Sequence, residues 1–423
     1  MSSLDSIRQT RLANGLTVLT DRMETVETAS LGVWVNAGTR HETPEINGVS
    51  HLLEHMAFKG TERRSARAIA EEIEAVGGHL NAYTSREHTA YYAKILKEDV
   101  GLALDIIADI LQHSTIDAEE LAREQAVVVQ EISQSIDTPD DIIFDHFQAT
   151  AYPDQAVGRP VLGTADLVRG MSRNTLSGYM RNNYGAERMI LAAAGNLHHD
   201  DVVAMAESHF NALPKTSAAV EDVARYVGGE YRESRDLEQV HLVLGFDGVC
   251  YDDPDYYAAS VLSTLLGGGM SSRLFQEVRE KRGLVYSIYS FTSSYTDGGL
   301  FAIYAGTGEE EAAEVIPVVC DEVMKVTQSI GADEVQRARA QLKASILMAM
   351  ESTSARCEQL ARQIQAHGRL VPVEEMVAKV EAIDAEAVIA AARRLFVGTP
   401  TFAAIGPLDK VEGFDSVKRR LVL

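Results

Sequence analysis

The alternation of hydrophobic and polar residues predicts a regular succession of strands and helices over the first 136 residues. Alternation with a period of two indicates strands, and apolar residues recurring every three or four positions indicate helices. The predicted elements are, in order, strands at 16–21 and 29–38, helices at 47–58 and 65–76, β-rich sequence at 79–96, and helices at 98–112 and 117–136.

The same order recurs in the second half of the chain, with a strand at 238–248, helices at 255–268 and 271–283, and a β-hairpin at 284–306. A constant offset of 205 residues places identical residues in register, namely Glu72 with Glu277, Gly78 with Gly283 and Ser85 with Ser290. An internal duplication explains this best, because a period of about 200 residues is too long for a solenoid.

The duplication predicts an α+β fold with two homologous domains, each an antiparallel-rich mixed sheet covered on one face by helices. The 423 residues also exceed the size at which a single hydrophobic core stops growing. The segment 212–232 has the composition of a linker, although a strand predicted at 223–227 could belong to either side. We therefore place the domains at 1–225 and 226–423.

Composition and charge narrow the classes of function. The formal net charge of −23 disfavours nucleic-acid binding, because phosphate contacts require a basic surface, and favours cationic partners. No apolar stretch is long enough to cross a membrane, and we expect no export signal. The scattered Cys250, Cys320 and Cys357 predict reduced, buried thiols in the cytoplasm rather than disulfides.

Candidate chemistry concentrates in HLLEHMAFKG, residues 51–60. On a helix, positions i and i+4 share a face, so His51 and His55 can direct two imidazoles at one point, as a metal pair requires. Glu54 projects toward the same region and could accept a proton from a water molecule without binding the metal.

A catalytic zinc ion normally takes three protein ligands, so a carboxylate from another element is required. The helix at 117–136 offers Glu124 and Glu131, which are seven residues apart and therefore share a face with apolar residues. The alternative is that both histidines are ordinary core residues and that the glutamates pair with Arg123 or with solvent.

The motif H-x-x-E-H resembles that of the inverted-zincin metallopeptidases, a family that includes pitrilysin, insulin-degrading enzyme and the mitochondrial processing peptidase. Members carry a later glutamate ligand, and Glu131, 76 residues after His55, stands at the family spacing. The likeness covers essentially the whole chain, including GGHLNAYTSREHTAYYA and SSRLFQEVREKRGLVYSIYS. It implies one Zn²⁺ per chain held by His51, His55 and Glu131, with Glu54 as the general base and Glu124 supporting the ligands.

The same resemblance assigns roles in the second half. Family members use an arginine and a tyrosine, seven residues apart, to stabilise negative charge on the substrate carbonyl, and these correspond here to Arg279 and Tyr286. The alternative is a surface arginine paired with Glu277 or Glu280 and a half-buried strand tyrosine.

Two further segments correspond to substrate-binding regions of the family. One is an edge strand that binds extended peptide by backbone pairing, and the other resembles a short form of a glycine-rich recognition loop. The alternatives are ordinary strand residues and a helix cap with a tight turn. The residues concerned are Asn81, Ala82, Tyr83 and Thr84 in the strand and Gly267, Gly268 and Gly269 in the loop.

The resemblance thus implies a zinc-dependent endopeptidase acting on extended peptides or presequence-like segments. Because the chain is about half the size of the long single-chain members, we expect a homodimer to complete the enclosure around the peptide. The acidic charge favours basic peptides. The competing functions are a noncatalytic structural subunit of the family and a module that binds extended peptides without cutting them.

Overall fold

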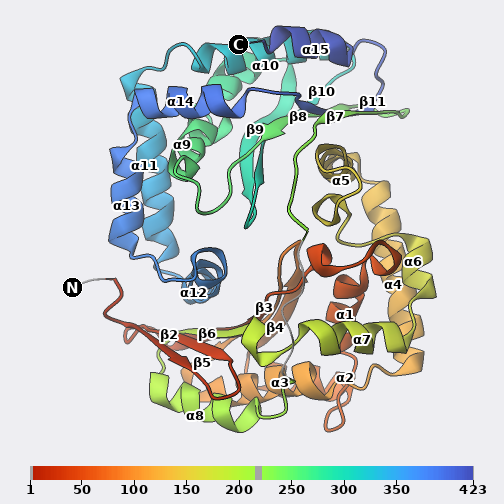
Figure 1. The fold of residues 1–423 in the computed structure, drawn as a ribbon, viewed down its shortest axis with the longest axis vertical. Coiled ribbons are helices and arrows are strands. Elements are labelled where there is room, and N and C mark those ends of the chain that lie inside the picture. The colour runs from red at the N-terminus through yellow and green to blue at the C-terminus, as the bar shows by residue number, and fades with distance from the viewer. Residues whose placement is uncertain (1–2, 215–221, 423) are drawn as a thin grey trace. The chain divides into compact units, whose positions relative to one another are not determined.

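The structure is a computed structural model that describes residues 3–214 and 222–422. The chain divides into two compact units, and most of their elements are labelled in Figure 1. Unit 1 comprises 1–134, 159–222 and 348–372, and unit 2 comprises 135–158, 223–347 and 373–423. The boundary between the predicted ranges 1–225 and 226–423 thus lies close to 222/223, where the chain passes from unit 1 to unit 2. The predicted ranges do not reflect that 135–158 belong to unit 2 and 348–372 to unit 1.

Unit 1 is built on a six-stranded sheet with the order β1-β2-β6-β3-β5-β4. Strands β2 and β6 are parallel, and all other neighbours are antiparallel. The strands are β1 (Ile7–Arg11), β2 (Thr17–Arg22), β3 (Thr28–Val35), β4 (His79–Thr84), β5 (Thr89–Leu96) and β6 (Met189–Gly195). The helices are α1 (Val49–Ala57), α2 (Ala66–Ala75), α3 (Val100–His113), α4 (Ala118–Ile136), α6 (Ala165–Gly170), α7 (Arg173–Asn183), α8 (His199–His209) and α12 (Thr353–His367).

Unit 2 is built on a five-stranded sheet with the order β7-β11-β8-β10-β9. Its strands are β7 (Gly229–Ser234), β8 (Val240–Asp247), β9 (Val285–Ser294), β10 (Gly299–Thr307) and β11 (Thr401–Gly406). The helices are α5 (Pro139–Ala151), α9 (Tyr256–Gly267), α10 (Ala312–Val326), α11 (Ala332–Ala349), α13 (Val373–Ala382), α14 (Ala385–Leu395) and α15 (Phe414–Arg420).

Five of the six strands in unit 1 have the same topology as the sheet of unit 2, as the duplication predicts. The order β2-β6-β3-β5-β4 in unit 1 corresponds strand for strand to β7-β11-β8-β10-β9 in unit 2. In both sheets the first pair is parallel and the following pairs are antiparallel. The predicted fold class, two homologous α+β domains with antiparallel-rich mixed sheets, is confirmed.

In the second half, one local prediction is wrong and one element is shorter than predicted. The strand expected at 223–227 is absent, and β7 begins only at Gly229, because that residue is the first to pair with β11. The helix expected at 271–283 is present but shorter, since only residues 273–280 are helical, with a π-helical segment at Phe275–Glu280. Gly283, with a φ of +66°, turns the chain toward β9.

Each sheet also carries one helix on the face opposite its main layer of helices, and that helix comes from the other half of the sequence. In unit 1, α12 lies on the far side of the sheet from α3 and α8 (Figure 1), and its Cys357, Leu360 and Ala361 pack against Trp34. In unit 2, α5 covers the second face in the same way, with Phe147 at its centre. Periodicity within one segment carries no information about these distant partners.

Candidate metal centre

Helix α1 carries the two histidines of the H-x-x-E-H motif. Its apolar side, Val49, Leu52, Leu53 and Met56, is at most 1% exposed and packs into the core of unit 1. The amphipathic pattern therefore fixes the rotation of the helix about its axis. As a consequence, His51 and His55 lie on the side that faces away from the core, one turn apart.

Helix α4 brings the carboxylates. Leu121, Val128 and Ile132 are buried, so this face of α4 packs inward along its length. Glu124 and Glu131 occupy the adjoining stripe, and Glu124 is only 6% exposed. Buried carboxylates are costly unless they are paired or bind a cation, and both glutamates meet the histidines of α1.

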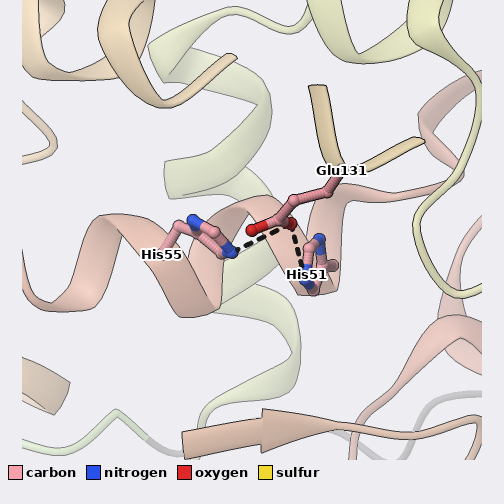
Figure 2. Close-up of side chains that lie close together, drawn as sticks. All are labelled: His51, His55 and Glu131. Carbon is pink, nitrogen blue, oxygen red and sulfur yellow. Dashed lines mark ion pairs between the residues drawn. The ribbon is translucent and has the colours of Figure 1, made fainter. Parts of the chain in front are cut away.

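Three ligand atoms converge between these helices. Glu131 Oε2 lies 3.5 Å from His55 Nε2 and 3.7 Å from His51 Nε2, as Figure 2 shows. The two imidazole rings lie edge to face, with 4.7 Å between their centroids. A zinc site needs at least three ligand side chains of His, Cys, Asp or Glu close together. Within the described part of the chain, these three have ligand atoms that all lie within 4.8 Å of one another.

This geometry suits zinc. Two ligand atoms at about 2.0–2.1 Å from a tetrahedral zinc ion are about 3.4 Å apart, close to both distances from the Glu131 carboxylate. Two imidazoles and one carboxylate are also a donor set that leaves a fourth position for water. Burial and the neighbouring His55 lower the pKa of His51 to about 4, so at neutral pH its ring has a free lone pair for a metal.

Glu124 orients His55 from the opposite side of its ring. Glu124 Oε2 lies 3.0 Å from His55 Nδ1, and Glu124 Oε1 forms an ion pair of 2.7 Å with Lys59 Nζ. Because Nδ1–H is engaged by the carboxylate, Nε2 is the nitrogen left to bind a metal. Arg123, the alternative partner considered for this glutamate, pairs instead with Glu119 and Glu120.

Lys59 is a site residue that the sequence analysis missed. The only available signal was its position four residues after His55, which places it near the same side of the chain. Its charge compensates the buried Glu124 carboxylate. His51 has no such support, because its Nδ1 is buried without a hydrogen-bond partner among the described residues.

Glu54 is positioned by strand β4. Its Oε2 accepts a hydrogen bond of 2.6 Å from Thr84 Oγ1. Burial raises the pKa of Glu54, and the Thr84 hydrogen bond partly opposes this shift. A carboxylate whose pKa is raised is a stronger proton acceptor, as a general base working near neutral pH requires.

Strand β4 carries the four residues predicted to contact substrate. It is the edge of the unit 1 sheet, and among the described strands only β5 pairs with it. Tyr83 is anchored by hydrogen bonds between its hydroxyl and Trp34, His88 and Glu358. The Thr84 side chain is engaged by Glu54, which the sequence did not indicate.

A cavity of about 310 Å³ lies between α2 and β4. Its lining is mainly apolar and includes Phe58, Ile69, Ile73, Leu80 and Asn81. Phe58 is the C-cap of α1, three residues after His55, so the cavity borders the end of the motif helix and the edge strand.

Arg279 and Tyr286 belong to unit 2. The Arg279 guanidinium lies over the Phe275 ring, 4.8 Å from its centre, and Glu277 pairs with Lys281 and Arg282 instead. Tyr286 is 66% exposed. It is the extra residue of a β-bulge in β9, since Val285 and Ser287 pair with consecutive residues of β10, and bulges re-aim side chains.

The glycine run has a packing explanation at two of its three positions. A Cβ atom on Gly267 would lie 2.3 Å from the Ser290 backbone nitrogen of β9, and one on Gly268 would lie 2.6 Å from Thr264 Cα. Gly268 also caps α9. At Gly269 only the Gln341 side chain is near, at 3.7 Å, so packing does not demand glycine there.

The comparisons with known proteins agree with the motif. Residues 17–165 match the family described as insulinase (peptidase family M16), and residues 170–342 match the peptidase M16 inactive domain. A Rickettsia felis protein described as an uncharacterized zinc protease is 40% identical over 405 residues, covering 96% of this chain and 98% of that protein. The chain belongs to the M16 peptidase family.

Other M16 relatives include a probable mitochondrial-processing peptidase subunit beta of Arabidopsis thaliana, 38% identical over 99% of this chain and 82% of that protein. The crystal structure of a peptidase M16 inactive domain from Pseudomonas fluorescens has a TM-score of 0.90, with 22% identity, over 96% of this chain and 99% of that one. That likeness shows the fold. The family resemblance inferred from the sequence is therefore confirmed.

Proposed function

We propose that this M16 chain is a zinc-dependent endopeptidase that hydrolyses extended peptides or presequence-like segments. The observation that carries the proposal is the convergence of His51, His55 and Glu131, within 4.8 Å of one another, beside a glutamate free of the ligand set. We propose one Zn²⁺ per chain in this site.

When bound, zinc supplies a Lewis acid that polarises a carbonyl oxygen and makes a water molecule easier to deprotonate. Glu54 accepts the proton on its carboxylate, and the same group then returns it to the leaving amine. Thr84 holds Glu54 in place through one carboxylate oxygen, which leaves the other oxygen for proton transfer. Glu124 keeps His55 in the tautomer that presents Nε2.

Strand β4 is proposed to bind the peptide. Among the described strands, none pairs with its outer edge, and an extended peptide can add to such an edge as a further strand. This mode reads the main chain and tolerates varied side chains, which suits a peptidase acting on unfolded segments. The cavity lined by Phe58 and Leu80 offers a site for an apolar side chain of the peptide next to this strand.

The donors for the developing negative charge are proposed to be Arg279 and Tyr286, acting in a homodimer. The exposure of Tyr286 and its place in a bulge support a role beyond packing. The net charge of −23 favours basic peptides.

The proposed location is the cytoplasm. Cys250, Cys320 and Cys357 are free thiols, which agrees with a reducing compartment. Within the described residues, none of the helices is both long and apolar enough to cross a membrane.

Metal removal tests the cofactor. The purified protein is expected to contain about one zinc per chain by elemental analysis and to cleave a basic, extended fluorogenic peptide. Treatment with a chelator should remove the zinc and the activity together, and added Zn²⁺ should restore both. A protein that cleaves the peptide equally well after complete zinc removal would contradict the proposal, and one that binds zinc without cleaving any peptide would favour the noncatalytic alternatives.

Thr84→Val tests the link between the edge strand and the general base. Loss of a hydrogen bond to a charged group costs about 1.5–3 kcal/mol, so we expect kcat/KM to fall by about 10-fold to 100-fold. Zinc content should not change, because Thr84 does not contact a ligand. Thr84→Ser keeps the hydroxyl and is the matched control, and equal activity in the Val and Ser variants would show that the Thr84 hydroxyl has no part in catalysis.

A further inference from the structure

A buried carboxylate lies at the start of the helix that carries both histidines. Glu42 is 4% exposed. Its Oε2 accepts hydrogen bonds from the backbone N–H of Gly48, at 2.8 Å, and from Asn47 Nδ2, at 2.9 Å, and its Oε1 accepts one from the Ser50 N–H, at 2.8 Å. Among the described residues, no ion pair includes this carboxylate.

The first N–H groups of a helix have no acceptor within the helix. In α1 the N-cap residue is Gly48, which has no side chain to serve as a cap. From the preceding loop, Glu42 supplies acceptors for the N–H groups of Gly48 and Ser50, and its negative charge lies at the positive end of the helix dipole, where it is stabilising. His51 is the third residue of α1, so it follows directly on the turn that Glu42 holds.

The surroundings of this turn are closely packed. A Cβ atom on Gly48 would lie 2.7 Å from the Leu162 carbonyl oxygen, and one on Gly163 would lie 2.4 Å from the Asn47 carbonyl oxygen. Ser50 Oγ also donates a hydrogen bond of 2.8 Å to the Tyr179 hydroxyl. In this close-packed turn, Glu42 is the charged group that contacts the helix backbone.

We propose that Glu42 is a positioning residue of the metal centre, which fixes the first turn of α1 and thereby directs His51 and His55 toward Glu131. The inference rests on the proposed zinc site. It assigns Glu42 no contact with the metal or the substrate. Its effect passes through the backbone of Gly48 and Ser50 to the orientation of the two rings.

The test is the zinc affinity of Glu42→Gln, measured by competition with a chelating dye on protein shown to be folded by circular dichroism. Glutamine keeps the size of the side chain but removes the charge and turns an NH₂ group toward a backbone N–H. We expect the zinc dissociation constant to rise about 10-fold to 100-fold, as for other residues that support metal ligands. Glu45→Gln, an exposed glutamate of the same loop, is the matched control and should bind zinc as the wild type does.

A folded Glu42→Gln variant with lower thermal stability but wild-type zinc affinity would overturn the inference, since the contact would then serve stability alone. If Glu42→Gln does not fold, Glu42→Asp decides. Aspartate keeps the charge but is too short to reach both N–H groups, so weakened zinc binding supports the inference and wild-type affinity overturns it. Because the readout is zinc affinity, a wild type that binds zinc but cuts no peptide would refute the proposed activity and leave this test intact.

Discussion

Replacing Glu54 by glutamine is expected to reduce peptide hydrolysis by about 10³-fold to 10⁴-fold, within the range that general acid–base catalysis contributes. Glutamine has nearly the same shape and can still accept the Thr84 hydrogen bond, but it cannot take up a proton. Zinc content should stay near the wild-type value, because the ligand atoms belong to His51, His55 and Glu131.

The measurement pairs steady-state kinetics on a basic peptide with elemental analysis of the same preparation. Glu62→Gln, an exposed glutamate in the loop after α1, is the control and should retain full activity. A Glu54→Gln variant that keeps more than about a tenth of the wild-type rate would assign the base to another group, since that loss is below the usual range for a general base. Loss of zinc from this variant would instead make Glu54 part of the ligand set.

Glu131→Gln is expected to remove zinc binding, and activity with it. The substitution exchanges the single anionic ligand of the site for a neutral amide, and the two imidazoles that remain are insufficient for a tight site. The dissociation constant should rise by more than about 100-fold, which exceeds the 10-fold to 100-fold typical of residues behind the ligands. The fold should persist, because the Glu131 side chain is 39% exposed.

Zinc affinity by dye competition, with circular dichroism for the fold, measures this effect. Glu119→Gln is the matched control, since it lies on the same helix and its side chain is 84% exposed. If Glu131→Gln binds one zinc as tightly as the wild type, the ion sits elsewhere or takes another third ligand. The proposed active site would then be withdrawn, while the membership of the M16 family would stand.

The local structure around Arg279 and Tyr286 in unit 2 could not be predicted from the sequence. Resemblance assigns Arg279 and Tyr286 a role in catalysis, and periodicity places Arg279 in a helix at 271–283 and Tyr286 near the start of a β-hairpin at 284–306. The structure adds that Tyr286 protrudes from a bulge and that Arg279 stacks on Phe275. A bulge depends on the register between two strands, which a single strand's sequence does not specify.

The sequence by itself determined the features that depend on near neighbours. The i, i+4 spacing put His51 and His55 on one face of α1, the apolar stripe decided which face is buried, and the repeat at an offset of 205 residues predicted two sheets of like topology. Helix periodicity made Glu124 and Glu131 candidates, and the spacing of Glu131 from the motif, which resembles that of a known family, selected Glu131 as the ligand. The first two signals can be read from the sequence because a helix repeats with a fixed period, and the other two because related sequences keep the same spacing.

Only the tertiary structure decided which distant groups complete the site. It paired Lys59 with Glu124, Thr84 with Glu54, and Glu42 with the N-terminus of α1, and it laid α5 and α12 on the second faces of the two sheets. These contacts arise when separately formed elements pack together and every buried charge or N–H group must find a partner. The partners are atoms that are close in space but distant in the sequence, so the hydrophobic and polar pattern along the chain does not identify them.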